Sequence, residues 1–188
     1  MVRPRSGSGA LVNSVIAIAV RRWLKSTSNR TFVVYPVCVI AFELALHRAA
    51  HGTWGTWATW DPRDMLATYG TVPWGIVLLA WGYLQYRLVG SYRLRHGGGG
   101  PGIAVPPERI VAQGPYRVVR NPMYLGHLIF MMGLALSFRS WLGLALFAFH
   151  VVWFQRRVVE DEARLQSLFG DPYRAYIAQV KRWIPGIL

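Results

Sequence analysis

Residues 114–124 read Gly-Pro-Tyr-Arg-Val-Val-Arg-Asn-Pro-Met-Tyr, a basic, turn-forming stretch that lies directly before an apolar run. Gly114-Pro115 predicts a turn, because proline fixes its own φ and restricts the residue before it. Asn121-Pro122 predicts the N-cap and first residue of a helix, since asparagine can bond a free amide and proline has none. Arg117 and Arg120 would then lie beside the positive end of a helix dipole. The stretch predicts an anion site; the alternative is a basic loop that contacts lipid phosphates.

Two short apolar runs follow this stretch. They extend from Met123 to Phe138 and from Trp141 to Phe154, and Arg139-Ser140 separates them. About 16 helical residues at 1.5 Å each give about 24 Å, which is shorter than the roughly 30 Å hydrocarbon core of a bilayer. We therefore expect a tight helical hairpin whose arginine tip keeps its charge at the membrane surface.

The second helix of this hairpin is expected to continue to Phe169, because Gly170 is a typical residue just after a helix end. Within this continuation, Glu160 shares a face with arginines, which predicts a solvated ion pair. Glu162 falls instead on an apolar stripe. The stripe consists of Val158, Val159, Leu165 and Phe169. A carboxylate there predicts burial against a polar or cationic group, either a ligand or a partner such as Arg117 or Arg120.

The segment upstream of the central stretch, residues 90–113, is the longest polar connection in the chain. Its glycine-rich part, Gly97–Gly102, predicts a hinge. It does not predict a phosphate-binding loop, because no Lys-Ser/Thr pair follows and no strand precedes.

Two longer apolar runs, Phe32–Leu46 and Tyr69–Val89, predict membrane spans. Glu43 lies near the end of the first run. An ionisable residue at membrane depth indicates a function, and the alternative is an interfacial partner of His47 or Arg48. His47 and His51 lie one helical turn apart, but a metal site needs a third ligand that the sequence does not supply. Between the runs, residues 51–68 carry three tryptophans and predict an aromatic belt on the membrane surface.

The N-terminal segment, residues 1–30, contains a shorter apolar run, Ala10–Val20, followed by the basic and aromatic residues 21–25. About 11 apolar residues are too few to cross a bilayer, so we expect an interfacial helix. A secretory signal is the alternative, but no small-residue cleavage site follows the run.

The composition indicates a membrane protein. Hydrophobic residues make up 53% of 188, and 21 Lys and Arg outnumber 8 Asp and Glu. Because the basic residues alternate with apolar runs, they favour a membrane over nucleic acid. The single cysteine, Cys38, excludes an internal disulfide. We predict one all-α integral membrane domain over residues 1–188, with about four transmembrane helices. The distribution of basic residues places both termini and the loop 90–113 in the cytoplasm.

Two spaced motifs carry a family resemblance. The first is Gly-Pro-Tyr-x-x-x-Arg-x-Pro-x-Tyr in residues 114–124, and the second is Asp-Glu-x-x-Leu-x-x-x-Phe-Gly-x-x-Tyr-x-x-Tyr in residues 161–176. With the hairpin between them and Trp-Ile-Pro at residues 183–185, they resemble isoprenylcysteine carboxyl methyltransferases and related membrane phospholipid methyltransferases. The resemblance covers about residues 90–188. The chain departs from the family at Asn121, which replaces a histidine, and at Asp161, which replaces a glutamate.

The resemblance implies an S-adenosylmethionine site on the cytosolic side, in a catalytic half formed by residues 90–188. Methyl transfer is an in-line displacement that requires orientation and desolvation, so no metal is expected. The arginines would receive an anion, and Glu162 an amino group or ribose hydroxyls. Arg120 and Glu162 are the catalytic candidates. The candidates for cofactor binding are Gly114, Pro115, Tyr116, Arg117, Arg120, Asn121, Pro122, Tyr124, Asp161, Glu162, Tyr173 and Tyr176. His96 and His127 could assist, although a lone histidine is more often structural.

The methyl acceptor stays open, because family members methylate either a prenylcysteine carboxylate or a lipid amine. Lys25 and Lys181 are the only lysines, and this preference for arginine is typical of a GC-rich bacterial genome. It favours a lipid or small hydrophobic acceptor in a bacterial inner membrane. The hinge is expected to close over the bound cofactor and exclude water. Two alternatives use a similar helical frame: a non-catalytic membrane protein and a nicotinamide-dependent reductase.

Overall fold

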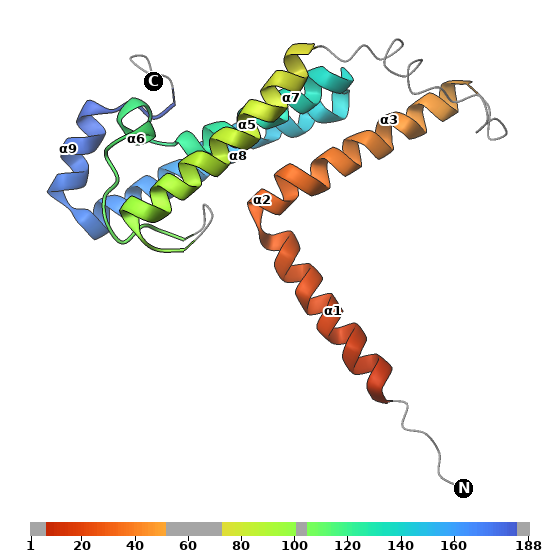
Figure 1. Cartoon of the computed structure of the whole chain (residues 1–188), viewed down its shortest axis with the longest axis horizontal. Coiled ribbons are helices and arrows are strands. Elements are labelled where there is room, and N and C mark those ends of the chain that lie inside the picture. The colour runs from red at the N-terminus through yellow and green to blue at the C-terminus, as the bar shows by residue number, and fades with distance from the viewer. Residues whose placement is uncertain (1–6, 52–72, 101–104, 184–188) are drawn as a thin grey trace, which may run out of the picture.

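The structure is a computed structural model that describes residues 7–51, 73–100 and 105–183. In these residues every regular element is a helix, so the predicted all-α fold is confirmed for them (Figure 1). The elements are α1 (Gly7–Lys25), α2 (Thr27–Asn29), the π-helical turn η1 (Arg30–Val34), α3 (Tyr35–His51), α5 (Pro73–Gly97), α6 (Pro115–Val118), α7 (Pro122–Phe138), α8 (Trp141–Phe169) and α9 (Asp171–Gln179).

Within residues 7–51, 73–100 and 105–183, two helical segments are long and apolar enough to cross a membrane. They are Thr27–Ala49, which joins α2, η1 and α3, and Trp141–Phe169, which is α8. Their mean hydropathies are 1.6 and 1.3, and α7 is apolar but shorter. The first segment includes the predicted span Phe32–Leu46. Four crossings remain a prediction, because α5 and α7 do not meet the same criterion of length and hydropathy.

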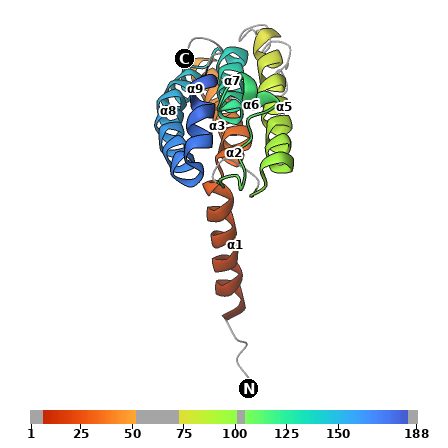
Figure 2. The ribbon, with the colours of Figure 1, turned by 90° about the vertical axis from the view of Figure 1, so that its left-hand side faces the viewer.

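The N-terminal helix α1 is longer than the predicted run Ala10–Val20, because it continues through the basic residues to Lys25. Figure 2 shows α1 projecting away from the other helices. Its apolar side chains at Val15, Ile16 and Ile18 are more than half exposed. Exposed apolar residues next to a basic end are typical of a helix that lies on a membrane.

The helix α5 differs from the predicted span Tyr69–Val89. Within the described residues it begins at Pro73 and extends to Gly97, so the prediction that a polar connection starts at Gly90 is wrong. The helix continues because Val89, Arg93 and Gly97, four residues apart, form one buried face. Residues 52–72, which include most of the predicted aromatic belt, lie outside the described residues.

The helices α5 and α7 lie side by side in both ribbon views and pack backbone to backbone. A Cβ added at Gly82 on α5 would lie 2.5 Å from the backbone nitrogen of Phe130 and 2.7 Å from the carbonyl of Gly126. A Cβ added at Gly133 on α7 would lie 2.6 Å from the nitrogen of Leu79. Small residues of this kind allow close helix pairs in membranes. The pair α5–α7 is therefore the frame on which the rest of the C-terminal half is built.

The predicted hairpin is confirmed: Arg139 and Ser140 alone join α7 to α8. Arg139 adopts a left-handed conformation with φ 47°, and its backbone N–H closes the last turn of α7. Ser140 caps α8 by accepting a hydrogen bond from the Gly143 N–H at 3.1 Å. The hairpin returns the chain along α8 toward the beginning of α7, which places the two motifs, residues 114–124 and 161–176, at the same end of the bundle (Figure 1).

The acidic and histidine residues of α3 do not form a metal site in the described part of the chain. Glu43 is buried, and the side chain of His51 lies outside the description. Among the described residues, no group of three His, Cys, Asp or Glu is arranged to hold a metal ion.

Candidate functional site

The central stretch folds as a turn, a single helical turn and the beginning of α7. Gly114 has φ 57°, which favours glycine, and α6 follows at Pro115. Asn121 and Pro122 occupy the N-cap and first position of α7, as the sequence predicts. The expected side-chain cap is wrong, however: Asn121 Nδ2 donates to Glu162 Oε1 at 3.1 Å instead. A hydrogen bond to a carboxylate is charge-assisted and stronger than a neutral one, so Glu162 orients the Asn121 side chain through its amide nitrogen.

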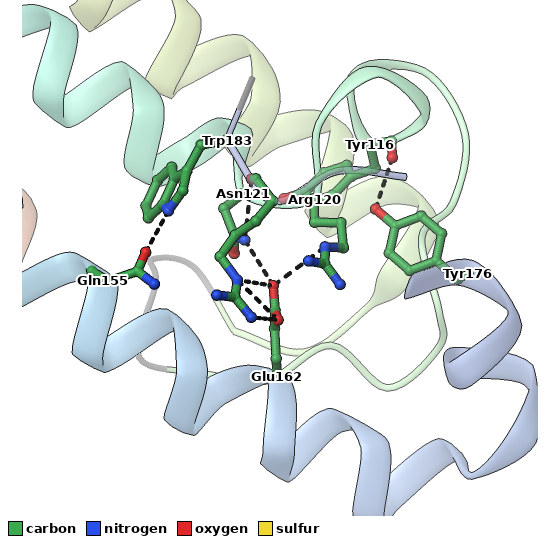
Figure 3. A network of polar contacts seen from close by, with 8 residues as sticks. Tyr116, Arg120, Asn121, Gln155, Glu162, Tyr176 and Trp183 are labelled. Carbon is green, nitrogen blue, oxygen red and sulfur yellow. Dashed lines mark hydrogen bonds and ion pairs between the residues drawn. The ribbon is translucent and has the colours of Figure 1, made fainter. Parts of the chain in front are cut away.

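Glu162 lies at the centre of a polar cluster that joins three parts of the chain (Figure 3). Its Oε1 is 3.4 Å from Arg120 Nε. Its Oε2 accepts hydrogen bonds from Arg182 Nη2 at 2.9 Å and Nε at 3.2 Å. Glu162 is only 7% exposed. The prediction of a carboxylate buried against a cation is therefore confirmed, and Arg182 is a second partner that the sequence did not indicate.

The apolar stripe around Glu162 is confirmed in part. Val158 is fully buried, and Leu165 and Phe169 are half-buried. Val159 is 46% exposed, so its assignment to the stripe is wrong. One residue along a helix turns the side chain by about 100°, which carries Val159 off the face shared by Val158 and Glu162.

Asp161 makes a second cluster beside the first. It accepts a hydrogen bond from the Tyr124 hydroxyl on α7 at 2.6 Å and another from Arg164 Nη2 at 2.8 Å. Arg157 Nε lies 3.6 Å from the same carboxylate. Glu160 points to solvent and pairs only weakly with Arg157 at 3.8 Å, as predicted. Successive acids of α8 therefore have three different environments.

A cavity of about 90 Å³ opens onto both clusters, and we call it the central cavity. A smaller cavity of about 50 Å³ adjoins it through shared walls that include Arg120 and Tyr173. The central cavity is lined by Arg93, Pro106, Pro107, Tyr116, Arg120, Asn121, Met123, Tyr124, Asp161, Glu162, Arg164, Leu165 and Tyr173.

The structure brings eight of the predicted site residues to these cavities and leaves four outside. Seven line the central cavity, and Tyr176 lines its smaller neighbour. The four that line neither are Gly114, Pro115, Arg117 and Pro122. Arg117 is exposed on α6, so only one of the two predicted anion-binding arginines faces the site. His96 is exposed against Tyr92, and His127 is buried among aromatic rings.

Arg93 is a site residue that the sequence did not reveal. It is 7% exposed on α5, and its guanidinium donates to the carbonyls of Gly100 at 2.9 Å and Val105 at 2.8 Å. It thereby ties Gly100, in the glycine-rich segment, and Val105, which follows that segment, to the wall of the central cavity. Arg93 could have been found from its position in the sequence, because it lies four residues from both Val89 and Gly97 and therefore on the same helix face.

Three tyrosines give the site neutral hydrogen-bond donors. The Tyr176 hydroxyl donates to the Tyr116 carbonyl at 2.7 Å and so joins α9 to α6. Burial raises the pKa of Tyr116 and of Tyr176 well above the ordinary value. Burial, with a further contribution from the Glu162 charge, raises the pKa of Tyr173 to about 12. All three phenols therefore stay protonated at neutral pH.

Arg120 retains binding capacity that the described protein groups do not use. Its Nη1 is buried and has no hydrogen-bond partner among the described residues. The same side chain lines both cavities. A buried guanidinium nitrogen without a partner is costly, so it favours an anionic ligand at this position.

The chain is similar in sequence to known methyltransferases. Residues 67–171, more than half of the chain, match the phospholipid methyltransferase family. The chain is 36% identical over 78 residues to a protein-S-isoprenylcysteine O-methyltransferase of Schizosaccharomyces pombe. This alignment covers 40% of this chain and 33% of that protein. It is 32% identical over 80 residues to protein-S-isoprenylcysteine O-methyltransferase B of Arabidopsis thaliana. This alignment covers 42% of this chain and 40% of that protein.

A shorter relative is matched along its whole length. An uncharacterized protein of Haemophilus influenzae is 35% identical over 65 residues, which is 33% of this chain and 100% of that protein. By contrast, the chain aligns with only about a third to two fifths of the two named methyltransferases. The family match covers α5, α6, α7 and α8, which carry most of the central cavity. This chain belongs to the phospholipid methyltransferase family.

Proposed function

We propose that the chain transfers a methyl group from S-adenosylmethionine to a lipophilic acceptor in the membrane. The observation that carries the proposal is the cluster in which Arg120, Glu162 and Arg182 meet at the wall of a cavity. Family membership supports the same activity. Arg120, the Glu162 carboxylate and the tyrosines are the residue types that a zwitterionic cofactor with hydroxyl groups requires.

The donor set of the central cavity fits S-adenosylmethionine. The unpartnered Nη1 of Arg120 would receive its carboxylate, and the carboxylates of Asp161 and Glu162 would receive its amino group and ribose hydroxyls. When bound, the cofactor supplies an electrophilic methyl group on a sulfonium. The residues here bind and orient it, and an in-line displacement needs no metal from the protein.

Glu162 has a positioning role in this proposal as well as a binding role. Its two oxygens hold Arg120 and Arg182 from opposite ends of the C-terminal half. A site whose charges are fixed before the ligand arrives reorganises little on binding. Asp161 would fix Tyr124 and Arg164 in the same way through its hydrogen bonds.

We propose that the loop beside the central cavity moves to admit the cofactor, and the small volume of the cavity supports this. About 90 Å³ is less than the roughly 300–1,000 Å³ of typical cofactor sites. Pro106 and Pro107 line the cavity, and they follow the glycine-rich segment held by Arg93. Gly98 and Gly99 have φ of 69° and 77°. Proline cannot adopt these angles, so its introduction there would disrupt the turn as well as its motion.

The acceptor is a prenylcysteine-type carboxylate or a lipid amine in this proposal. The names of the two methyltransferase relatives refer to isoprenylcysteine, which supports the carboxylate. The description of the matched family refers to phospholipids, which supports the lipid amine. We place the protein in a bacterial inner membrane with four crossings and both termini in the cytoplasm. In a Cys38→Ala background, Trp57→Cys should react with an impermeant thiol reagent from outside and Gln113→Cys should not; labelling of both would reject this topology.

Calorimetric titration with S-adenosylhomocysteine and with NADPH tests the cofactor. We expect saturable binding of the first and none of the second, and the reverse would indicate a reductase. Incubation with methyl-labelled S-adenosylmethionine and lipid extracts, followed by mass spectrometry, then identifies the acceptor. Binding of neither ligand would reject methyl transfer in favour of a non-catalytic membrane protein.

A further inference from the structure

Tyr124 also lines a second and larger cavity. It has a volume of about 340 Å³, and we call it the basic cavity. It is lined by Lys25, Thr27, Arg30, Tyr124, Trp153, Phe154, Arg156, Arg157 and Glu160. Four cations and one acid give its wall a formal charge of +3. Three of these residues lie before residue 67, where the family match begins, so the family likeness does not assign this cavity a role.

The positive charge of the basic cavity is largely uncompensated. Arg157 approaches Asp161 and Glu160, but no acid among the described residues lies within ion-pair distance of Lys25, Arg30 or Arg156. Arg30 Nε is buried without a hydrogen-bond partner in the described part of the chain. An excess of converging cations with unused donors is a binding site for an anion, and guanidinium groups match phosphate geometry well.

The position of the basic cavity indicates where that anion comes from. Thr27 begins one candidate membrane span, and Arg156 follows the apolar run of α8 that ends at Phe154. The cavity therefore lies where two apolar segments become polar, at the level of lipid head groups. Its inner wall is aromatic: Phe154 is fully buried, and the Arg30 guanidinium lies 5.2 Å from the Trp153 ring centre. Tryptophan and arginine are typical of this interfacial layer.

We propose that the basic cavity binds the phosphate of a net-anionic phospholipid from the bilayer. The cations would hold the phosphate, and the exposed apolar residues of α1, such as Val20 and Leu24, would lie beside the acyl chains. The bound head group would be separated from the central cavity by the Tyr124 side chain, which lines both. This site is distinct from the one proposed for methyl transfer, because none of its cations lines the central cavity, although Arg157 lies 3.6 Å from Asp161, which does.

The test uses the purified full-length chain in detergent micelles with tail-labelled phosphatidylglycerol or phosphatidylcholine, read by fluorescence anisotropy. Wild type should prefer phosphatidylglycerol. Each cation near an anionic lipid contributes a factor of about five, so Arg30→Gln/Arg156→Gln should weaken phosphatidylglycerol binding about 30-fold. The control is Arg174→Gln, which removes one exposed cation on α9 and should leave binding within twofold.

Two further variants separate the loss of charge from a failure to fold. Arg30→Lys/Arg156→Lys retains the charge and should retain most of the affinity. If the glutamine pair fails to fold, the exposed Arg156 is replaced alone by glutamine, with a loss of about fivefold expected. Equal binding of the two lipids, an unchanged affinity in the glutamine variant, or full displacement of the lipid by millimolar inorganic phosphate would each overturn the proposal.

Discussion

Tyr124 lines both the central cavity and the basic cavity, but the two cavities differ in how their charged side chains are paired. In the central cavity the carboxylates of Asp161 and Glu162 are paired with arginines before any ligand binds. In the basic cavity Lys25, Arg30 and Arg156 have no acidic partner among the described residues. A site for a zwitterionic cofactor needs both signs of charge in fixed places, whereas a site for an anion needs a surplus of one sign.

The largest expected effect comes from removing the charge of Glu162. Glu162→Gln removes the counter-charge of the nearly buried Arg120 and of the partly exposed Arg182, which should lower the free energy of unfolding by about 3–5 kcal/mol. Each lost charge-assisted hydrogen bond costs about 1.5–3 kcal/mol, so affinity for S-adenosylhomocysteine should fall roughly tenfold to hundredfold. Calorimetric titration and thermal unfolding measure the two effects.

Glu160→Gln is the matched control, because it removes the same charge two residues earlier from an exposed position. It should leave cofactor affinity within twofold. Since Glu160 is the one acid on the wall of the basic cavity, its loss should slightly strengthen phosphatidylglycerol binding. Equal cofactor affinities in the two variants would mean that Glu162 is only a structural partner of its arginines.

The frame of the central cavity offers a second way to separate the two sites. Gly82→Ala would force a methyl group against the backbone of α7, and overpacking of this kind costs about 1–3 kcal/mol. Because Arg93 of α5 lines the central cavity and no α5 residue lines the basic cavity, cofactor affinity should fall more than phospholipid affinity. Gly90→Ala is the control, since its Cβ would meet only the flexible Met123 side chain at 3.4 Å. Equal losses at both sites would show that the cavities do not have separate frames.

A substitution at Tyr124, which lines both cavities, should have a smaller effect on cofactor affinity. Tyr124→Phe removes the hydroxyl that donates to Asp161 but keeps the ring. A neutral hydrogen bond contributes about 0.5–1.5 kcal/mol net, so cofactor affinity should fall about threefold to tenfold. Phosphatidylglycerol affinity should change less, because the hydroxyl interacts with Arg157 but with none of the other cations that line the basic cavity. A parallel loss of both affinities would indicate that the hydroxyl couples the two sites.

Alkaline pH gives the smallest effect in the working range. The pKa of Tyr173 is about 12 in the folded chain, against an ordinary value of about 10. A raised pKa means that the contribution to stability is fully present below pH 10 and is lost between pH 10 and 12. The melting temperature should therefore be flat from pH 7 to 9 and fall above 10, and Tyr173→Phe should reduce that fall. A fall that begins near pH 8 would contradict a buried, neutral phenol.

The sequence predicted the parts of the fold that depend on local chemistry. The hairpin at Arg139-Ser140, the beginning of α7 at Pro122 and the end of α8 before Gly170 follow from caps and turns. It missed the extension of α5 to Gly97, because the reason for that extension is a face buried by distant residues. Such burial cannot be read from a window of neighbouring residues.

The same distinction applies to the site. The proximity of Arg120 and Glu162 followed from the return of the hairpin, and the structure confirms it. Arg93 and Arg182 were missed because their partners are backbone carbonyls and a carboxylate far away in the sequence. Arg117 was assigned because it was expected beside the positive end of the helix that begins at Pro122, but its side chain is exposed on α6. The cofactor roles of all these residues remain predictions.

The cluster around Glu162 also determines when the site can form during synthesis. Asn121 precedes Glu162 by 41 residues, and Arg182 follows it by 20. The Arg120 N–H, moreover, bonds the carbonyl of Lys181. At about 5–20 residues per second, the ribosome needs about 1–4 s to add the last 20 of these residues. The hairpin, which ends with α8 at Phe169, is therefore synthesised before the cluster around Glu162 can close.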